Sequence, residues 1–547
     1  MHYDASFRNR LMSTGNHGPY NVADAFVDRH LVEGRSDKIA MVCGSRRITY
    51  RGMAELVGQT GHALLRSGVQ PEERVLVVLP DGPEFAAAYF GAMKIGAVAV
   101  PTSTFLHPAD YAYALAESRA RTLIVHASLL PAVASRLRDR ARVPQVVVCG
   151  GGAPSDVGVG WDDWLSGCSH ELEAAATTRE DVAFWLWTSG STGRPKAAVH
   201  LHGDWAICCD QYGGGVLGLT QEDVTFSASK LFHAYGLGNG LMFPFSVGAT
   251  TVVVPDRPRA TLVLETVQEQ RPTVLFSVPT LYAAMLQESE RTRFDLGSVR
   301  LAVSAAEPLP AAIFCRWRDR FGIEILDGIG STEVLHIYLS ARAGNVRPGS
   351  TGQAVPGYEL RIVDPAGQDV RPGAIGDLLV SGESTAPCYW NRRALTVDRM
   401  RGRWFFTGDK YSMDADGFYW YAGRSDDMFR VSGQWVSPNE VENALIAQGS
   451  VLEAAVVAYE EETRLLTPKA FVVLRPGVAP GPDLVGELQR FVKQRIAPHQ
   501  YPRRIEFLAE LPKNASGKLL RHRLRERAEA SPEAGREADS VTKGRST

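Results

Sequence analysis

Val182-Ala183-Phe184-Trp185-Leu186-Trp187 is an apolar run that leads directly into Thr188-Ser189-Gly190-Ser191-Thr192-Gly193-Arg194-Pro195-Lys196. A buried strand that opens into glycine and hydroxyl-bearing residues can gather backbone N–H groups around a phosphate. Lys196 adds a mobile positive charge. A flexible glycine and serine linker is the alternative, but this stretch continues into another apolar run, Ala197-Ala198-Val199. We therefore predict a loop that binds polyphosphate.

Two familiar phosphate-binding loops do not fit this stretch. Its lysine follows proline and precedes alanine, so the GxxxxGK[ST] pattern is absent, and no GxGxxG opens a helix after a strand. The loop therefore belongs to a different class of nucleotide-binding protein.

Length and composition limit what the chain can be. Its 547 residues are too many for one compact core, so two or more domains are expected. With 45% hydrophobic and 22% charged residues, the composition is that of an ordinary globular protein. A net charge of -2 leaves no excess positive field for nucleic acid or an anionic membrane. We expect small-molecule partners, no nucleic acid, no membrane, and a monomer or homodimer.

The N-terminus and the cysteines indicate a cytoplasmic protein. Residues 1–20 are polar and carry Asp4, Arg8 and Arg10, so they fit neither a signal peptide nor an anchor. No apolar run reaches the length that spans a bilayer. The seven cysteines are an odd number spread from Cys43 to Cys388, which does not suggest a disulfide framework. A reducing compartment fits this pattern best.

One cluster resembles metal ligands, where Cys208 and Cys209 follow shortly after His200 and His202. Adjacent cysteines point away from each other on a helix or a strand, and the paired CxxC spacing of zinc sites is missing. Small buried thiols are therefore the preferred interpretation.

Alternating strand and helix signals predict an α/β fold. Short apolar runs read as buried strands at 74–80, 122–126, 145–149, 224–227, 250–255, 273–279, 300–305 and 323–329. Amphipathic stretches lie between them, and 84–96 has helical spacing. We therefore expect a large N-terminal domain of mostly parallel, helix-covered sheets, with its site beyond the carboxyl ends of the strands.

The pattern changes after about Gly344. Short strands at 358–364, 377–381 and 418–421 are separated by glycine and proline turns, which predicts a small antiparallel or β-barrel-like unit. A strand–helix–strand set from 454 to 508 predicts a smaller C-terminal α+β domain of about a hundred residues. Charged and small residues fill 526–547, which we expect to be disordered.

Four further stretches carry polar residues typical of nucleotide sites. Gly330-Ser331-Thr332-Glu333 places a carboxylate where a strand meets solvent, either as a Mg²⁺ ligand beside polyphosphate or as part of a helix N-cap. Thr407-Gly408-Asp409 places an acidic group in a turn, where it can bind paired ribose hydroxyls. Gly423-Arg424-Ser425-Asp426-Asp427 marks the change to the terminal domain. Residues 512–518 form a turn-rich segment that ends in Lys518, or simply a solvated charged turn.

Together and in this order, these stretches resemble the adenylate-forming superfamily of acyl-CoA synthetases, peptide-synthetase adenylation domains and luciferases. The resemblance runs from about Asn21 to Arg525 and includes the TSGSTGRPK loop, the STE triplet, TGD, GRSDD and a terminal SGK lysine. Residues 230–239, 328–340 and 431–438 look like the benzoate-CoA ligase branch, which activates aromatic acids.

The resemblance implies ATP-dependent activation of an aromatic carboxylic acid in two steps. The carboxylate reacts with ATP to give an acyl-adenylate and pyrophosphate, and the thiol of coenzyme A then displaces AMP. ATP, Mg²⁺ and coenzyme A are the implied cofactors and co-substrates. An enzyme that loads aryl acids onto a separate phosphopantetheinyl carrier protein is the alternative, and a non-catalytic nucleotide-binding protein is a further one.

The resemblance also assigns roles to residues that match the motifs of the family. Catalytic roles fall on Lys518, Thr332 and Glu333, and Glu333 is the implied Mg²⁺ ligand. The implied ATP-binding residues are Thr188, Ser189, Gly190, Ser191, Thr192, Gly193, Lys196, Ser331, Thr332, Asp409 and Arg424. The implied acid-binding residues are His233, Ala234, Tyr235, Gly330, His336 and Ile337. The hinge and the passage for coenzyme A are implied at Asp426, Ser432 and Gly433.

A division into domains follows from the same resemblance. Residues 1–423 form the N-terminal adenylating domain, 424–429 the hinge, 430–527 a mobile C-terminal domain, and 528–547 the disordered tail. The C-terminal domain is expected to rotate between the two half-reactions, because Lys518 must leave before a thiol can approach the adenylate.

Two positions depart from the benzoate branch. His233 stands where phenylalanine is common, and Ala306 stands where glycine is frequent. His233 can donate to a ring hydroxyl or amino group, or gate the ATP side. Tyr235 and His336 are equally compatible with ordinary core packing. The departures favour a substituted benzoate-like or fused-ring aryl acid over plain benzoate.

Overall fold

The computed structural model describes residues 18–137, 145–151, 157–188, 194–431, 434–461, 465–513 and 519–530. In this part of the chain the strands form two large, mostly parallel sheets, a smaller antiparallel sheet, and the sheets of a C-terminal lobe. This arrangement confirms the predicted α/β class. Within these residues we find no helix with both the length and the apolar character of a membrane span.

The first large sheet has nine strands in the described part of the chain. In spatial order they are β16 (Gln353–Ala354), β15 (Ile337–Ser340), β14 (Ile325–Gly330), β13 (Leu301–Ser304), β12 (Val274–Ser277), β10 (Val224–Ser227), β11 (Thr250–Val253), β1 (Ile39–Cys43) and β2 (Arg46–Thr49). The pairs from β14 to β1 are parallel, and the edge strands β2, β15 and β16 pair antiparallel. The carboxyl ends of the parallel strands therefore meet at one edge.

The second large sheet has seven strands among the described residues. In spatial order they are β7 (Val159–Gly160), β6 (Gln145–Cys149), β5 (Thr122–His126), β3 (Arg74–Val78), β4 (Val98–Pro101), β8 (Val182–Thr188) and β9 (Lys196–Leu201). Its pairs are parallel except for the β8–β9 hairpin. The apolar run that precedes the glycine-rich loop is thus a strand, as predicted.

One hydrophobic core fills the space between the two large sheets. Successive side chains of a strand point to opposite faces, so Val274 and Phe276 belong to this central core while Leu275 belongs to the core on the outer face. The helices that share the central core are α3 (Tyr50–Arg66), α4 (Pro83–Lys94), α7 (Trp161–Leu165), α8 (His202–Cys208), α9 (Ala234–Leu237) and α10 (Phe243–Val247). The molecule is therefore built in layers.

Other helices cover the outer faces of the sheets. The nine-stranded sheet is covered by α11 (Ala260–Gln270), α12 (Pro279–Arg291) and α13 (Ala311–Phe321), and the seven-stranded sheet by α5 (Pro108–Ser118) and α6 (Leu130–Leu137). The short helical segments are α2 (Arg29–Val32), α14 (Arg393–Arg399), η1 (Asp24–Asp28), η2 (Ala127–Leu129), η3 (Cys209–Gly214), η4 (Gly238–Met242), η5 (Thr332–Val334) and η6 (Pro498–Gln500).

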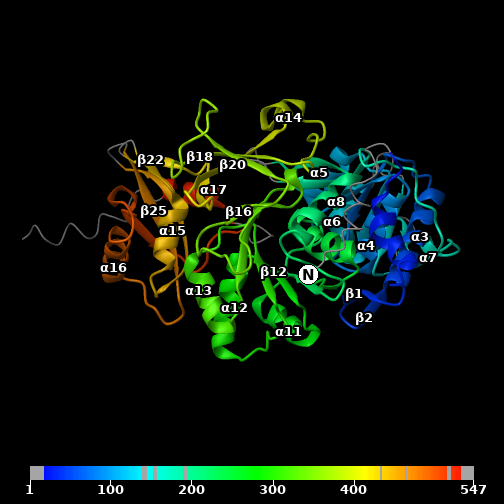
Figure 1. Cartoon of the computed structure of the whole chain (residues 1–547), viewed down its shortest axis with the longest axis horizontal. Helices are drawn as coiled ribbons and strands as arrows, with labels where there is room; N and C mark the ends of the chain where they lie inside the picture. Colours follow the sequence, from blue (N-terminus) through cyan, green and yellow to red (C-terminus); the bar gives the residue numbers. More distant parts are fainter. Residues whose placement is uncertain are drawn as a thin grey trace, which may run out of the picture.

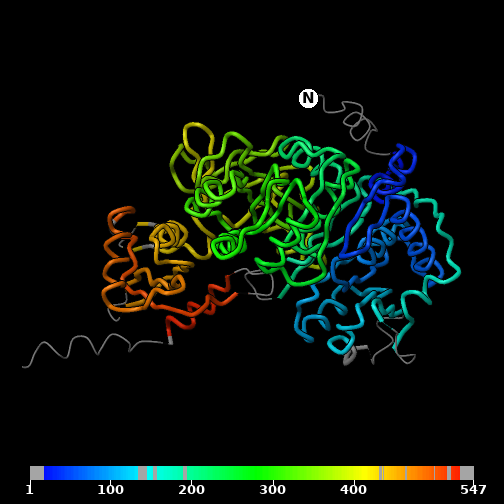
Figure 2. Tube along the Cα trace, turned by 90° about the horizontal axis from the view of Figure 1, so that it is seen from below, coloured from blue at the N-terminus to red at the C-terminus, as the bar shows by residue number. Residues whose placement is uncertain are grey.

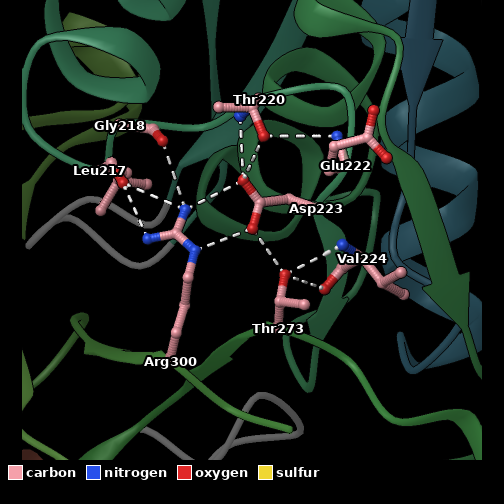
Figure 3. A network of polar contacts seen from close by, with 8 residues as sticks. All are labelled: Leu217, Gly218, Thr220, Glu222, Asp223, Val224, Thr273 and Arg300. Atoms are coloured by element: carbon pink, nitrogen blue, oxygen red, sulfur yellow. Dashed lines mark hydrogen bonds and ion pairs between the residues drawn. The ribbon is translucent and has the colours of Figure 1, made fainter. Parts of the chain in front are cut away.

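The amino ends of three neighbouring parallel strands are joined by a polar network (Figure 3). Asp223 precedes β10, Thr273 precedes β12 and Arg300 precedes β13. Arg300 donates to both carboxylate oxygens of Asp223 over 2.8 and 2.9 Å, and the Thr273 hydroxyl donates to Oδ1 over 2.7 Å. This network lies at the opposite edge of the sheet from the carboxyl ends, where the predicted site residues follow the strands.

The predicted antiparallel unit is present after the large sheets. It contains β17 (Glu359–Val363), β18 (Gly376–Ser381), β20 (Trp404–Met413), β19 (Met400–Arg401) and β21 (Tyr419–Arg424), with β21 also paired to β20. The structure corrects one expectation here, because Thr407-Gly408-Asp409 lies inside β20 and not in a turn. Gly408 has a φ of +77° within that strand, so the glycine accommodates an irregular strand conformation that resembles a turn signal in the sequence.

A C-terminal lobe lies at one end of the molecule, drawn in orange and red, and the earliest segments lie at the other end (Figures 1 and 2). Its elements are β22 (Phe429–Val431), β23 (Gln434–Val436), α15 (Pro438–Ile446), β24 (Val451–Glu460), β25 (Leu466–Leu474), α16 (Pro482–Lys493), β26 (Arg504–Phe507) and α17 (Arg521–Ala530). Helix α17 corrects the expected start of the disordered tail, because 526–530 are helical. Residues 531–547 lie outside the described part.

Candidate active site

The glycine-rich loop connects β8 and β9. Thr188 and Lys196 are the register partners at the loop end of this hairpin. Ser189, Gly190, Ser191, Thr192 and Gly193 lie outside the described residues. The two ends of the predicted polyphosphate loop are therefore held next to each other by strand pairing.

Glu333 lies in the 3₁₀ turn η5, directly after β14. Its Oε1 accepts a hydrogen bond from the Tyr389 hydroxyl over 2.7 Å and lies 3.4 Å from Lys196 Nζ. Lys196 Nζ also lies 3.9 Å from the centroid of the Tyr389 ring. Burial lowers the pKa of Lys196, and the charge of Glu333 opposes this effect. A hydroxyl and an ammonium from two other parts of the chain thus fix the carboxylate.

A single carboxylate at this place fits a magnesium site. Mg²⁺ takes one or two protein carboxylates and completes its octahedron with waters and substrate phosphates. Glu333 is 7% exposed, and both contacts described above involve only Oε1. Nearby, Ser331 Oγ is buried and has no hydrogen-bond partner among the described residues. Glu333 is therefore the residue that would hold the ion.

Asp409 and Arg424 form an ion pair across two neighbouring strands. They are register partners of β20 and β21, and Arg424 Nη1 lies 3.0 Å from Asp409 Oδ1. Arg424 Nη1 also donates to the Thr407 carbonyl over 3.1 Å. A Cβ on Gly408 would lie 2.9 Å from the Arg424 guanidinium, so the glycine of the TGD motif lets the arginine lie across β20.

Tyr338 indicates that these charged groups lie together. Its hydroxyl is buried and has no hydrogen-bond partner in the described part of the chain. Burial raises its pKa, and the charges of Asp409, Arg424 and Glu333 also act on it. Arg424 is likewise one of the charges that lower the pKa of Lys196. The residues predicted to bind the phosphates, metal and ribose of ATP thus share one electrostatic environment.

Two segments bring the predicted acid-binding residues together. Gly330 and Ile337 are register partners in β14 and β15. His336 Nε2 donates to the Tyr235 carbonyl, at the start of α9, over 3.4 Å, and their ring centroids are 5.7 Å apart. A Cβ on Gly330 would lie 2.5 Å from the His336 carbonyl oxygen. Any larger residue at Gly330 would therefore displace the segment that carries His336.

Both histidines of this region are uncharged at neutral pH. Burial lowers the pKa of His233 to about 4 and that of His336 to about 3. Because the Tyr235 carbonyl can only accept, Nε2 of His336 carries the hydrogen and Nδ1 keeps its lone pair. Nδ1 is buried and has no hydrogen-bond partner among the described residues. It is available to accept a hydrogen bond.

Three further polar side chains of this region are not among the site residues predicted from the sequence. Tyr389 donates to Glu333, and the charge of Glu333 acts on Tyr338. Neither tyrosine stands in a pattern that distinguishes it from a core tyrosine. Asp327 was detectable, because it interrupts the apolar run of β14. Its Oδ1 is buried without a partner in the described residues, and burial raises its pKa well above the usual value. It therefore favours the neutral form.

The cluster that resembled metal ligands is engaged in other contacts. His202 Nδ1 accepts from the Val22 backbone N–H over 3.2 Å, and Cys209 Sγ lies 3.3 Å from the Met242 carbonyl oxygen. Burial raises the pKa of Cys208 to about 12. Among the described residues no group of three or more His, Cys, Asp or Glu side chains could hold a metal ion.

Several predicted residues lie in or near the C-terminal lobe. Asp426 is exposed in the turn after β21, and its carbonyl accepts from Arg525 over 3.4 Å. Ser432, Gly433 and Lys518 lie outside the described residues. Lys513 and Leu519, which flank the segment that carries Lys518, form a β-bridge. The charges of Lys513 and Glu453 act on Glu307, which follows β13, so these two residues of the C-terminal lobe lie near the carboxyl edge of the nine-stranded sheet.

Residues 28–390 match the AMP-binding enzyme family, and residues 440–518 match the C-terminal domain of AMP-binding enzymes. The chain belongs to this family. Benzoate–CoA ligase of Thauera aromatica is 45% identical over 92% of this chain and 96% of its own length. The 4-hydroxybenzoate–CoA/benzoate–CoA ligase of Rhodopseudomonas palustris is 43% identical over 95% of this chain and 96% of its own length.

Solved structures lead to the same branch of the family. An anthranilate CoA ligase in complex with anthranoyl-AMP superposes with a TM-score of 0.91 at 40% identity, covering 95% of this chain and 99% of that one. A benzoate CoA ligase from Burkholderia xenovorans LB400 superposes with a TM-score of 0.85 at 42% identity, covering 92% and 100%. The predicted resemblance to the benzoate-CoA ligase branch is confirmed.

Proposed function

We propose that this chain is an AMP-forming ligase that activates an aromatic carboxylic acid with ATP and transfers the acyl group to coenzyme A. The observation that carries the proposal is the convergence of Lys196, Glu333, Asp409 and Arg424 in one electrostatic environment. Polyphosphate, a divalent cation and a ribose are recognised by cationic, carboxylate and acidic acceptor groups of this kind. The relatives described above are named as CoA ligases, which supports coenzyme A as the acceptor.

In this reaction the main tasks of the protein are to position the reacting groups and to neutralise their charge. A carboxylate oxygen bonds to the α-phosphorus of ATP while the bond to pyrophosphate breaks, and the thiol of coenzyme A later displaces AMP from the acyl carbon. Thr188 to Lys196 hold the pyrophosphate, and Thr332 lies beside the α-phosphate. Glu333 would hold Mg²⁺, which neutralises phosphate charge, and Asp409 with Arg424 binds the ribose.

The C-terminal lobe supplies the remaining group and then moves. Lys518 bridges the attacking carboxylate and the α-phosphate, where a compact ammonium offsets the charge of the transition state. We place the mobile domain at 430–527, its hinge at 424–429 with Asp426, and the pantetheine passage at Ser432 and Gly433. The position of Lys513 near Glu307 supports an arrangement in which the lobe serves adenylate formation.

The acid is an aryl acid that carries a hydrogen-bond donor on its ring. His233, Ala234, Tyr235, Gly330, His336 and Ile337 surround the ring in this proposal. The buried lone pair of His336 Nδ1 supports a hydroxyl or amino substituent, because a buried acceptor without a partner is costly and a donor on the substrate relieves it. We place the enzyme in the cytoplasm, because all seven cysteines are free.

The test is ATP–pyrophosphate exchange with a panel that contains benzoate and its amino, hydroxy and fused-ring analogues, followed by thioester formation with coenzyme A. We expect at least one aryl acid to stimulate exchange and to yield aryl-CoA and AMP. If an aryl acid stimulates exchange and is transferred to a holo-carrier protein but not to coenzyme A, the acceptor is the carrier protein. No stimulation by any aryl acid would contradict the proposal.

A further inference from the structure

His200 joins strand β9 to the turn that carries Glu333. The imidazole is fully buried and stacks on Phe184, with ring centroids 5.1 Å apart. Its Nε2 lies 2.7 Å from the Thr332 carbonyl oxygen, and its Nδ1 lies 2.8 Å from Asp204 Oδ2. A carbonyl oxygen only accepts, so Nε2 carries the hydrogen and donates it to Thr332.

Asp204 fixes the orientation of this imidazole. It stands in the first turn of α8, is 2% exposed, and its Oδ2 also accepts the backbone N–H of Leu201 over 3.1 Å. The carboxyl group is therefore anchored to the backbone beside the histidine that it contacts. With Nε2 donating to Thr332, the contact between Nδ1 and Asp204 takes one of two forms: Nδ1–H of an imidazolium donates to the carboxylate, or a protonated Asp204 donates to Nδ1. In both forms Asp204 holds the orientation of the ring that directs Nε2 toward Thr332.

One face of β9 contacts the Thr332–Glu333 segment at several points. Lys196, Ala198 and His200 are separated by even offsets, so they point to the same face of the strand. Lys196 contacts the Glu333 side chain, and Ala198 pairs and packs with Tyr389, whose hydroxyl donates to Glu333. His200 contacts the peptide group between Thr332 and Glu333. The strand thus holds both the side chain and the main chain of the turn.

We propose that His200, oriented by Asp204, is a positioning residue that fixes the Thr332–Glu333 peptide for binding of ATP with its divalent cation. The proposal rests on the function proposed above, because it takes Thr332 and Glu333 as ATP-site residues. An ordinary core histidine would need only burial and satisfied nitrogens. His200 differs from such a histidine, because its Nε2 binds the main chain of the turn that carries the proposed metal ligand Glu333.

Two substitutions separate the bond to Thr332 from the bond to Asp204. The amide nitrogen of glutamine lies about where Nε2 of histidine lies, whereas the amide of asparagine lies about where Nδ1 lies. His200→Gln therefore keeps the donation to Thr332 and loses Asp204, and His200→Asn does the reverse. We expect His200→Asn to weaken Mg·ATP affinity and pyrophosphate exchange about 10–100-fold, and His200→Gln to stay within about threefold of the unaltered protein.

His30 provides a matched control far along the chain. It is also fully buried, its Nε2 lies 2.6 Å from the Phe245 carbonyl oxygen, and its Nδ1 accepts from Arg35 over 2.8 Å. His30→Asn and His30→Gln are expected to lower the melting temperature without changing Mg·ATP affinity. Affinity is measured by calorimetry on the full chain, with Mg²⁺ and with ATP in EDTA, beside the melting temperature of each variant.

These affinity measurements test the role of His200 independently of the proposed function. His200→Asn with unaltered Mg·ATP affinity overturns this role, and so does an equal loss in the asparagine and glutamine variants. If His200→Asn does not fold, His200→Gln provides the test. This variant keeps the bond to Thr332 and should therefore keep its Mg·ATP affinity. A folded His200→Gln protein that loses this affinity overturns the proposal. If Mg·ATP binds but no aryl acid stimulates exchange, the proposed function fails, while the affinities of the variants still decide the role of His200.

Discussion

Tyr389 donates its hydroxyl to Glu333 Oε1 over 2.7 Å and presents its ring to the Lys196 ammonium. Tyr389→Phe removes the hydroxyl and keeps the ring. Because a hydrogen bond to a charged group contributes about 1.5–3 kcal/mol, we expect pyrophosphate exchange at subsaturating Mg·ATP to fall about tenfold or more. Initial rates over a range of Mg·ATP concentrations measure this change.

Tyr50 is the control for the loss of a buried hydroxyl. Its OH donates to the Ala249 carbonyl over 2.7 Å. Tyr50→Phe is expected to alter the melting temperature but not the KM for Mg·ATP. If both substitutions change this KM equally, or if Tyr389→Phe does not change it, the proposed role of Tyr389 in Mg·ATP binding is contradicted.

His336 is the residue at which we expect selection of ring substituents. Its neutral ring keeps a lone pair on Nδ1, and a hydroxyl or amino group of the acid can donate to it. His336→Phe keeps an aromatic ring and removes the acceptor. The preference for the best amino- or hydroxybenzoate over benzoate, as a ratio of kcat/KM, should fall about 3–10-fold. An unchanged ratio would contradict this role.

The sequence predicted the parts of the site that depend on local patterns and missed those that depend on the fold. Lys196, Glu333 and Arg424 stand in motifs, and the structure brings them together. Tyr389 lies 56 residues from Glu333 along the chain, so only the packing of β9 against η5 reveals their contact. His200 showed only a weak resemblance to a metal ligand, because its partner is a main-chain carbonyl that no side-chain pattern encodes.

At the scale of elements, the network around Asp223 joins the starts of β10, β12 and β13 (Figure 3). Burial alone would raise the pKa of Asp223, but hydrogen bonds from Arg300, Thr273 and the Thr220 backbone outweigh it and hold the pKa below its usual value. Asp223→Asn should lower the free energy of unfolding at pH 7 by about 1–3 kcal/mol and leave kcat unchanged, since the network lies opposite the site.

The pH dependence of this effect has a defined sign. A carboxyl group with a lowered folded-state pKa stabilises the protein above its unfolded pKa, near 3.9, and loses that contribution as pH falls through its folded pKa. The difference in melting temperature between the unaltered protein and Asp223→Asn should therefore be constant from pH 6 to 8 and narrow below about pH 4. A difference that grows on acidification would contradict this account.

Strand positions were largely predictable, because buried parallel strands are short apolar runs between turn residues. Strands β5, β6 and β10 coincide with the runs predicted at 122–126, 145–149 and 224–227. The TGD segment was misread, because Gly408 signals a turn locally while pairing with β18 and β21 keeps the chain in a strand. Sheet order could not be predicted, since it depends on contacts between distant strands.

For the whole molecule, two regions where the lobes approach each other lie away from the junction of β21 and α15. Residues of α12 and α13 share a small cleft with α15 and the turn after it, lined by Ala283, Ala312, Ile313, Arg316, Ile446, Ala447, Gly449, Leu452 and Arg475. At the carboxyl edge of the nine-stranded sheet, Glu307 is placed near Lys513 and Glu453. Lys513 is the last described residue before Lys518 in the sequence, so in the proposed mechanism this region is relevant to the half-reaction that the lobe serves.

Under the proposed rotation of the C-terminal lobe, Glu307 is expected to make the lobe arrangement depend on pH. Burial raises its pKa to about 7, opposed by Lys513 and reinforced by Glu453. When the lobe rotates away, Glu307 is expected to be better solvated and its pKa to fall toward the ordinary value of 4.5. The arrangement of this structure then binds a proton more tightly than the rotated one. Raising the pH from about 4.5 to 7 therefore weakens it, and the effect levels off above pH 7.

We expect the ratio of adenylate formation to thioester formation to fall as pH rises from about 5.5 to 7 and then to level off. Pyrophosphate exchange measures the first half-reaction, and coenzyme A with supplied acyl-adenylate measures the second. Glu307→Gln keeps an acceptor but cannot titrate, so its ratio should lose this fall. Comparing the two proteins cancels the pH dependence of the carboxylate and the thiol themselves. Identical ratio profiles would show that Glu307 does not couple protonation to the position of the lobe.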